Sequence, residues 1–537
     1  MVLKYLCVFS CLTFPVVAFT QPKTKDTAKI NQIEVTAVEV MPIKEKKLPH
    51  QTLANINGLQ INAAKRTELI VLNNSEVNTA ENNPRQVFAK IPGINVWEMD
   101  GTGNQVSIAT RGLNPHRSWE LNVRQNGFIL NSDLFGYPEA HYNPPLQAVE
   151  RIEFVRGAGA LQYGQQFGGM LNYILKEGDT TKPIAVETHQ TIGSFGLFSS
   201  YTAIGGTKGN WQYYAYYNNR SSNGWRENSD YRFDAWHIGV NYFATKKVKI
   251  HVEVSHMEYV NHFGAGLTDS MFTVNPRQSN RNRNYFNPDM YVQGLRLDWK
   301  INNSLKFQLS ASAILGQRNS VQFIDIPTVK DTLPPRIVDR DYYNSYSAEA
   351  KLLYQYKVLG REHAIATGVR VVNNTTLRSQ RGQGTTKALF DLSLTAPYQL
   401  DIKFKTQAYG AFAENIFNLS KKLLLIIGAR YESNITTMQG KYFNFRAEDI
   451  PVNLDRNIAQ AGLGIEYKLS ETVKVFANYA QGYRPVIYSD ILPHTPLDKV
   501  DNNIKDAFGS NSEIGTPGNL KKILQLTLRI IESPQWK

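Results

Sequence analysis

The stretch from Glu150 to Ile174, ERIEFVRGAGALQYGQQFGGMLNYI, joins a strand-like apolar run to a series of closely spaced glycines. Two other stretches precede it: PRQVFAKIPGINV, which begins at Pro84, and RGLNP, which begins at Arg111. Pro84 suits the first turn of a helix, and Pro92-Gly93 suits its end. The glycine spacing matches neither a Walker loop nor a GxGxxG before a helix. The three stretches therefore predict a small mixed α/β domain.

In chain order, the stretches that begin at Pro84, Arg111 and Glu150 resemble the plug domain of TonB-dependent outer-membrane receptors, which lies inside a large β-barrel. We expect this domain at residues 80–180. The resemblance implies an importer of the bacterial cell outer membrane, not an enzyme, with no cofactor of its own. It also implies four kinds of partner: a TonB-type energy transducer, a transported ligand, the barrel assembly machinery, and outer-membrane lipid with lipopolysaccharide.

Residues 1–20 have the pattern of a cleaved export signal. Lys4 precedes an apolar run from Tyr5 to Phe19, and Gln21 follows a plausible cleavage site. The run has about fifteen residues, fewer than the roughly twenty that a spanning helix needs. The chain's cysteines, Cys7 and Cys11, both lie inside this segment. The mature chain is therefore expected to contain no disulfide.

Residues 21–79 are predicted to form a periplasmic arm and a linker. Within the arm, one segment resembles the TonB box, which pairs strand to strand with the transducer: Ile33, Glu34, Val35, Thr36 and Ala37. Its position between an export signal and a plug supports this interpretation. An ordinary β-prone linker is the alternative.

From about residue 186, apolar and polar residues alternate with a period of two. Val248, Ile250 and Val252, for example, alternate with Lys249 and His251. The chain has 28 Tyr and 25 Phe, a mean hydropathy of −0.36, and no second apolar run that is long enough for a helix. This pattern is typical of strands with one face in lipid and one in a wet lumen. We therefore predict an all-β fold, a transmembrane antiparallel β-barrel with an N-terminal mixed α/β plug.

Short polar turns alternate with long Asn-, Arg- and Tyr-rich loops at 261–287, 319–341 and 374–402. Six short turns indicate about twelve strands between residues 186 and 485, whereas plugged transporters have about 22. Residues 181–515 are therefore predicted to form a partial β-barrel. Residues 516–537 lack the two-residue period and are interpreted as an aberrant tail of a truncated chain. A partial barrel would leave unpaired strand edges in lipid, so an inactive fragment is one alternative.

The formal net charge is +13, but Lys and Arg are scattered along an exported chain. A basic lumen that attracts anionic ligands fits this distribution better than nucleic-acid binding. No GxSxG or HExxH motif is present, and His251 and His256 would face opposite sides of a strand. We therefore predict neither catalytic residues nor a metal site.

Within the receptor family, the plug is most similar to ferric dicitrate receptors, on Arg111–Pro115, Val155–Gly157 and Tyr163-Gly164. This resemblance implies iron held by a small anionic chelator and bound by cationic and hydrogen-bonding side chains. Their positions nominate six ligand-binding candidates: His116, Arg117, Trp119, Asp133, Tyr137 and His141. Solvated loop residues are the alternative for each, and arginines 277, 281 and 283 are equal candidates.

Three functions remain open from the sequence. The first is import of a ferric chelate, either ferric citrate or a siderophore. The second is import of another nutrient, such as cobalamin or an oligosaccharide. The third is a non-transporting barrel, either an adhesin or a hydrolase, which would have no use for a plug.

Overall fold

The computed structural model describes most of the chain after the predicted arm, in these ranges: 52–72, 77–89, 91–99, 101–157, 160–164, 166–443, 453–470, 473–492, 500–501, 503–516 and 529–531. The predicted export signal and Ile33–Ala37 lie outside these ranges, as does most of the predicted tail. Among the described helices, none has both the length and the apolar character needed to cross a membrane.

The N-terminal domain, called the plug from here on and taken as residues 52–180, is built on a small mixed sheet. Its strand order is β3-β8-β9-β6-β7, with β6 parallel to β9 and the other pairs antiparallel. Two strand pairs flank it, β1 with β2 and β4 with β5. The bounds are Ile56–Asn57 (β1), Gln60–Ile61 (β2), Thr67–Val71 (β3), Ile94–Val96 (β4), Ile108–Thr110 (β5), Asn122–Gln125 (β6), Phe128–Ile129 (β7), Val149–Val155 (β8) and Met170–Leu175 (β9). β3 lies in the stretch predicted as linker, yet it pairs with β8.

The helix predicted at Pro84 is confirmed as α1, Pro84–Phe88. The side chain of Asn83 accepts hydrogen bonds from the amides of Arg85 and Gln86, which caps the helix. Val87 and Phe88 are buried and form the apolar face of the helix. Three further helical segments with described bounds are single turns: η2 (His116–Ser118), η3 (Leu146–Ala148) and α2 (Ala160–Tyr163).

Gly164 shows why glycines are needed where the plug meets the surrounding sheet. Its φ is +95°, and a Cβ there would lie 2.6 Å from Nη2 of Arg370, on strand β18. Only glycine adopts this backbone conformation without strain and also leaves room for the neighbouring side chain. Gly164 therefore forms a tight turn directly against the inner face of the sheet.

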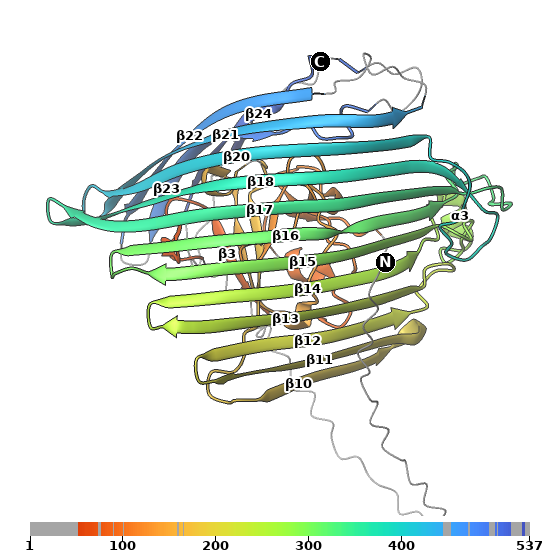
Figure 1. Ribbon diagram of the computed structural model, residues 1–537, viewed down its shortest axis with the longest axis horizontal. Helices are drawn as coiled ribbons and strands as arrows, with labels where there is room; N and C mark the ends of the chain where they lie inside the picture. The colour runs from red at the N-terminus through yellow and green to blue at the C-terminus, as the bar shows by residue number, and fades with distance from the viewer. Residues whose placement is uncertain are drawn as a thin grey trace, which may run out of the picture. The chain divides into compact units, whose positions relative to one another are not determined.

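A 16-stranded antiparallel sheet makes up the rest of the described chain. Its strands follow one another in sequence order from β10 to β25, and the short strand β19 pairs with β18 beside this path. Figure 1 shows the order from β10 to β18. The bounds are Ala185–Gly193 (β10), Leu197–Lys208 (β11), Trp211–Ser222 (β12), Tyr231–Thr245 (β13), Val248–His262 (β14), Tyr285–Lys300 (β15), Leu305–Gln322 (β16), Ile337–Val358 (β17), Arg361–Gly384 (β18), Leu394–Ala396 (β19), Leu400–Asn418 (β20), Leu423–Tyr442 (β21), Asn453–Lys468 (β22), Lys474–Arg484 (β23), Ala507–Gly515 (β24) and Arg529–Ile531 (β25). The sheet therefore has more strands than the short turns indicated, and β25 lies in the predicted tail.

The alternation of short turns and long loops is confirmed. Strand pairs such as β13 and β14, or β17 and β18, are joined by two residues. The loops at the opposite end are long, and one carries helix α3, Asp269–Val274 (Figure 1). They are shorter than predicted because polar residues continue the strands: Gln383, expected in a loop, still pairs with Ile337.

Burial in the large sheet is inverted relative to a soluble protein. On β14, the apolar Val252 is 46% exposed, whereas its charged neighbour Glu253 is 1% exposed. Ile238 and Leu295, on β13 and β15, are exposed in the same way. An apolar outer face and a polar inner face suit strands that lie in lipid.

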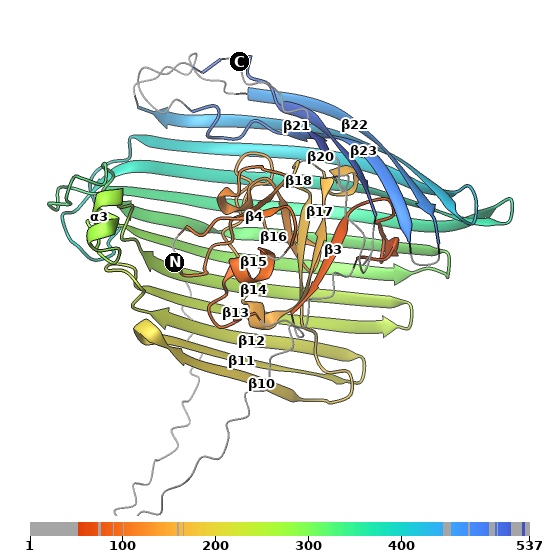
Figure 2. The same ribbon diagram turned by 180° about the vertical axis from the view of Figure 1, so that it is seen from behind.

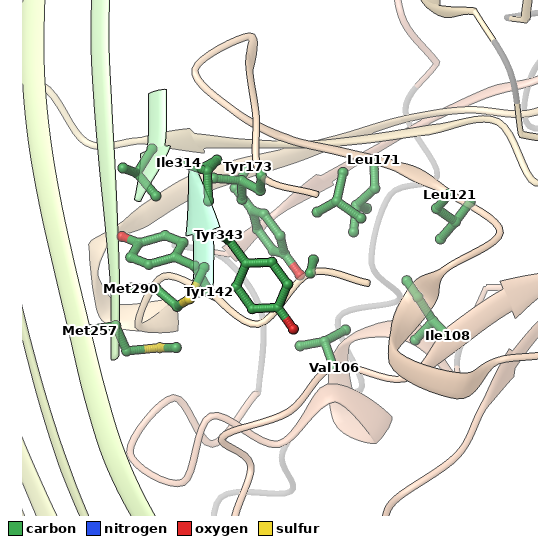
Figure 3. Packing of buried hydrophobic residues seen from close by; sticks show 14 of the residues in the cluster. Val106, Ile108, Leu121, Tyr142, Leu171, Tyr173, Met257, Met290, Ile314 and Tyr343 are labelled. Atoms are coloured by element: carbon green, nitrogen blue, oxygen red, sulfur yellow. The ribbon is translucent and has the colours of Figure 1, made fainter. Parts of the chain in front are cut away.

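The plug lies against the inner face of the sheet (Figure 2). One continuous apolar cluster joins the two parts: Val106, Ile108, Leu121 and Leu171 of the plug pack together with Met257, Met290, Ile314 and Tyr343 of the sheet (Figure 3). The plug is thus held inside the sheet by a shared core, which fixes the positions of its loops.

Candidate functional site

The turn that carries His116 and Arg117 has an unusual backbone. Arg117 and Ser118 both have a positive φ, 42° and 55°, which costs on the order of 1–3 kcal/mol for each residue. Ser118 Oγ donates to the carbonyl of Val106 at 2.9 Å and accepts from the amide of Ile108 at 3.2 Å. Val106 and the first residue of β5, Ile108, therefore hold this turn in its strained form.

A second loop, Asn131–His141, lies next to this turn and is called the apical loop. The amide of Ser132 donates to the carbonyl of Glu139 at 2.9 Å, and Asp133 and Tyr137 exchange two backbone hydrogen bonds of 2.9 Å. The side-chain amide of Asn131 donates to the carbonyl of Pro138 at 2.5 Å. These bonds close the loop on itself, so that Tyr137, Glu139 and His141 stay together.

Glu139 is the common partner of four predicted ligand-binding residues. Its Oε2 accepts from Arg117 Nη1 at 2.7 Å and from the Tyr137 hydroxyl at 2.8 Å. His116 Nε2 lies 3.6 Å from its Oε1, and His141 Nε2 lies 3.8 Å from its Oε2. The structure thus gathers these four side chains around one buried carboxylate.

The protonation states follow from these contacts. Burial alone would raise the pKa of Glu139, but the charge of Arg117 and the contacts with His116 and His141 hold it well below its usual range. Burial, together with the charge of Arg117, keeps the pKa of His141 well below its usual range. Burial and the charge of Glu139 raise the pKa of Tyr137 to about 12. At neutral pH, Glu139 is therefore an anion, His141 is neutral, and Tyr137 is a hydrogen-bond donor.

The facing wall of the sheet has its own carboxylate. Asp341 on β17 pairs with Arg318 at 2.7 Å and with Arg378 at 3.5 Å. Around Glu139, the sheet contacts the plug through aromatic stacking and cation–π pairs. Tyr137 stacks on Tyr343 with ring centroids 5.2 Å apart. The Arg378 guanidinium lies 5.3 Å from the Tyr137 ring, and the Arg117 guanidinium lies 4.8 Å from the Phe286 ring. The site as a whole is rich in arginine and tyrosine, which suits binding of an oxygen-rich anion.

Trp119 belongs to an outer aromatic rim of this site. His116 lies between Trp97 and Trp119, with ring centroids 6.1 Å and 6.2 Å away. Trp97 is 48% exposed, and the Arg484 guanidinium lies 5.9 Å from the Trp119 ring. A ligand that approaches Arg117 from solvent on this side would first contact the rim.

Asp133 does not join the other five candidates. Its carboxylate accepts from Asn374 Nδ2 at 2.6 Å, from the Tyr488 hydroxyl, and from the amide of Phe135 at 3.1 Å. Tyr488 also donates its own amide to the carbonyl of Gly136 at 2.8 Å. These contacts identify Asp133 as the anchor that ties the apical loop to the large sheet.

The loop arginines that the sequence offered as equal candidates are engaged within the loops. Arg281 donates to the carbonyls of Val329 and Asp325, at 2.6 Å and 2.8 Å. Arg283 forms a buried ion pair with Asp331 at 3.0 Å. Both side chains connect their own loop to the neighbouring loop that carries Asp325, Val329 and Asp331. Arg277, which donates to the carbonyl of Trp225 at 2.8 Å, is the more exposed of the three.

Sequence reasoning missed Glu139, Arg318 and Arg378. Glu139 lies between two predicted ligand-binding residues, Tyr137 and His141. A carboxylate between them in the sequence was the one pattern that could have identified it. The two arginines lie on strands far away in sequence, so no local pattern marks them. Within the described ranges, no group of three or more His, Cys, Asp or Glu side chains could hold a metal ion.

Comparison with known families decides the class of the protein. Residues 190–522 match the family "TonB dependent receptor-like, beta-barrel". The chain belongs to the TonB-dependent receptor family. Residues 51–170 match the TonB-dependent receptor plug domain. As a member of this family, the chain is an outer-membrane β-barrel protein of bacteria, and its family consists of receptors and transporters.

Individual relatives are distant. The vitamin B12 transporter BtuB of Vibrio vulnificus (strain CMCP6) is 29% identical over 97 residues, which are 18% of this chain and 15% of the relative. The ferric enterobactin receptor of Pseudomonas aeruginosa (strain PAO1) is 25% identical over 172 residues, 30% of this chain and 22% of the relative. The chain thus aligns with less than a quarter of each curated relative. The unliganded ferric citrate transporter FecA has the same fold, with a TM-score of 0.71 and 19% identity over 84% of this chain and 67% of that one.

Proposed function

We propose that this receptor binds a ferric chelate at the plug apex and imports it across the outer membrane. A TonB-type transducer, driven by the proton-motive force of the inner membrane, would supply the energy. The cargo of this proposal is a ferric complex of a small anionic chelator, such as ferric citrate. Iron is then part of the substrate, and the protein needs no resident cofactor.

The arginine- and tyrosine-rich site around Glu139 carries this proposal. Arg117, Arg318 and Arg378 offer planar cations at the inner end of a solvent-exposed aromatic rim. Such groups bind carboxylate and other oxygen-rich anions by bidentate hydrogen bonds. The fold shared with the ferric citrate transporter and the local similarity to the ferric enterobactin receptor support the same class of cargo.

The energy-coupling segment of the proposal is Ile33–Ala37. It would pair with the transducer as an added strand, where backbone hydrogen bonds give affinity with few demands on sequence. Force applied there reaches the described plug through the residues before β1. Ligand binding at the apex and pulling at the N-terminus are then separate steps, and they can be measured separately.

Cobalamin is a second candidate cargo. The local similarity to a vitamin B12 transporter favours it, and a cobalamin molecule would use the aromatic rim more than the arginines. The two cargoes differ in their need for positive charge at the apex, so the site itself offers a way to distinguish them.

The test is direct binding to the full chain in detergent micelles, followed by uptake in cells that lack their own iron-chelate receptors. We expect radiolabelled ferric citrate to bind and cyanocobalamin not to compete. Deletion of residues 33–37 should abolish uptake and leave surface binding unchanged. Binding of cyanocobalamin without any ferric chelate would replace the first proposal by the second, and uptake that survives the deletion would reject the proposed coupling.

A further inference from the structure

One carboxylate of the chain itself occupies the cationic part of the apical site. Glu139 accepts hydrogen bonds from Arg117 and Tyr137 and lies within 4 Å of the ring nitrogens of His116 and His141. Glu139 is 8% exposed. All of these partners belong to the plug, and none of these contacts holds the plug to the large sheet.

The arrangement around Glu139 is that of a bound ligand carboxylate. A carboxylate that takes a guanidinium hydrogen bond, a phenol hydrogen bond and two imidazole contacts is recognised as fully as an anionic substrate would be. A side-chain carboxylate and a carboxylate of a chelator present the same atoms to Arg117. They therefore compete for the same donors.

Other polar atoms at the site are left without partners. Tyr137 has one hydroxyl hydrogen, and it goes to Glu139, so His141 Nε2, 3.0 Å from that hydroxyl, acts as the donor in this pair. Within the described residues, the buried atoms His141 Nδ1, Tyr343 Oη and Arg318 Nε have no hydrogen-bond partner. Buried polar atoms are nearly always hydrogen-bonded, so these three mark places for ligand or water atoms that carry both donors and acceptors.

Glu139 is also linked to the anchor of the apical loop. The carbonyl of Glu139 accepts from the amide of Ser132. The residue after Ser132, Asp133, is held by Asn374 of β18 and by Tyr488, which follows β23. A displacement of the Glu139 side chain therefore acts on a short closed loop whose other end is attached to the sheet. Such a loop has few ways to move. A displacement of Glu139 is therefore passed on to Asp133 and to its contact with the sheet.

We propose that Glu139 is an internal competitor that sets the specificity of the site: it holds Arg117 and His116 until a carboxylate of the ligand takes its place. This inference rests on the proposed function and deepens it, because it names carboxylate-bearing anionic chelates as the cargo class. Neutral ligands cannot displace Glu139, and weakly charged anions compete poorly with it. Displacement also shifts the apical loop, which links occupancy of the site to a change in the plug.

The test is a comparison of Glu139→Gln with wild type in binding of ferric citrate and of cyanocobalamin. Glutamine has nearly the same shape but no charge, so it competes poorly for Arg117. Because the wild-type site must first release its own carboxylate, E139Q should bind ferric citrate on the order of tenfold more tightly. Cyanocobalamin binding should not improve. A merely structural role for Glu139 predicts the opposite sign, a weaker site.

Glu150→Gln is the matched control. It removes the same charge from a half-exposed plug residue that pairs with Arg151, outside the apical site, and it should leave binding unchanged. In the double variant E139Q/R117Q the gain should vanish, since the contested donor is gone. Wild-type binding of ferric citrate without a gain in E139Q, or an equal gain in E150Q, overturns the role of Glu139 alone. Failure of wild type and of every variant to bind ferric chelates rejects the proposed function, and this inference with it.

Discussion

The plug meets the large sheet in two ways, and the contrast separates binding from anchoring. At the apex, charges are satisfied within each side: Arg117 pairs with Glu139 of the plug, and Arg318 pairs with Asp341 of the sheet. Elsewhere, plug charges are satisfied by the sheet: Lys65 pairs with Glu414 at 2.7 Å. Around Glu139, aromatic stacking and cation–π pairs join the two sides, whereas hydrogen bonds to Asp133 anchor the apical loop to the sheet.

Arg124 extends the same pattern of anchoring. Its guanidinium makes two hydrogen bonds to Glu349 of β17, at 2.8 Å and 3.0 Å. Separating the plug from the sheet at such a point leaves buried charges without partners, which is far more costly than parting stacked rings. The apex can therefore rearrange around a ligand, while the rest of the plug keeps its place until force is applied.

The largest effect is expected from Lys65→Met, which breaks an anchoring pair. Glu414 would stay buried at 1% exposure without its cation, so the opening free energy of residues 61–65 should fall by about 3–5 kcal/mol. Amide hydrogen exchange of these residues measures the change. Lys65→Met combined with Glu414→Leu should recover most of the loss. Equal protection in K65M and wild type would show that the pair does not anchor the plug.

A smaller effect is expected from pH at Glu120, which lies near Arg484, the last residue of β23, and Asp490, in the segment after β23. Burial raises the pKa of Glu120 to about 7, with Arg484 opposing the shift and Asp490 adding to it. The folded protein holds this proton more tightly than the unfolded chain does. Stability from the neutral acid is thus fully present below the unfolded pKa of about 4.5 and is lost as the pH rises to about 7.

The measurement for Glu120 is plug protection against hydrogen exchange at pH 5 and pH 8, corrected for the intrinsic rates. Wild type should lose up to about 3 kcal/mol of local stability between these values. Glu120→Gln, which cannot ionise, should show little of this change. A pH response that persists unchanged in E120Q would assign it to other groups.

The smallest effect on stability is expected from Tyr343→Phe at the apex. This variant removes a hydroxyl without a partner in the described structure and keeps the ring that stacks on Tyr137. Stability should change by no more than about 0.5 kcal/mol. Binding of ferric citrate should nevertheless weaken if the hydroxyl receives the ligand. A large loss of stability would mean that polar contacts, not rings, hold the apex to the sheet.

The predictions from sequence were most accurate where the signal is local. Helix α1 begins at Pro84 because proline and the Asn83 cap favour that start, and Val252 faces outward because alternation fixes the face of each strand residue. The loop ends were less accurate, since the polar residues of β18 pair with β17 although their composition suits a loop. The number of strands was underestimated for a related reason: short turns mark strand pairs only where the turn is recognisable in the sequence, whereas strand pairing depends on the whole sheet.

At the site, the sequence nominated residues one at a time. Arg117, Tyr137 and His141 do lie together, but Asp133 is an anchor, and Glu139, the centre of the cluster, was not nominated. Residue type alone cannot distinguish an anchor from a ligand contact, because both roles suit a carboxylate. The distinction depends on which side chain of the large sheet faces the residue.

The sequence by itself determined the class of the protein: ordered plug motifs and a two-residue period are local patterns, and local backbone chemistry produces them. Only the tertiary structure decided the pairings. Lys65 meets Glu414 across 349 positions, and Asp133 meets Tyr488 across 355. Such contacts depend on the register of every strand between them and on where the plug rests against the sheet, and no local pattern records either.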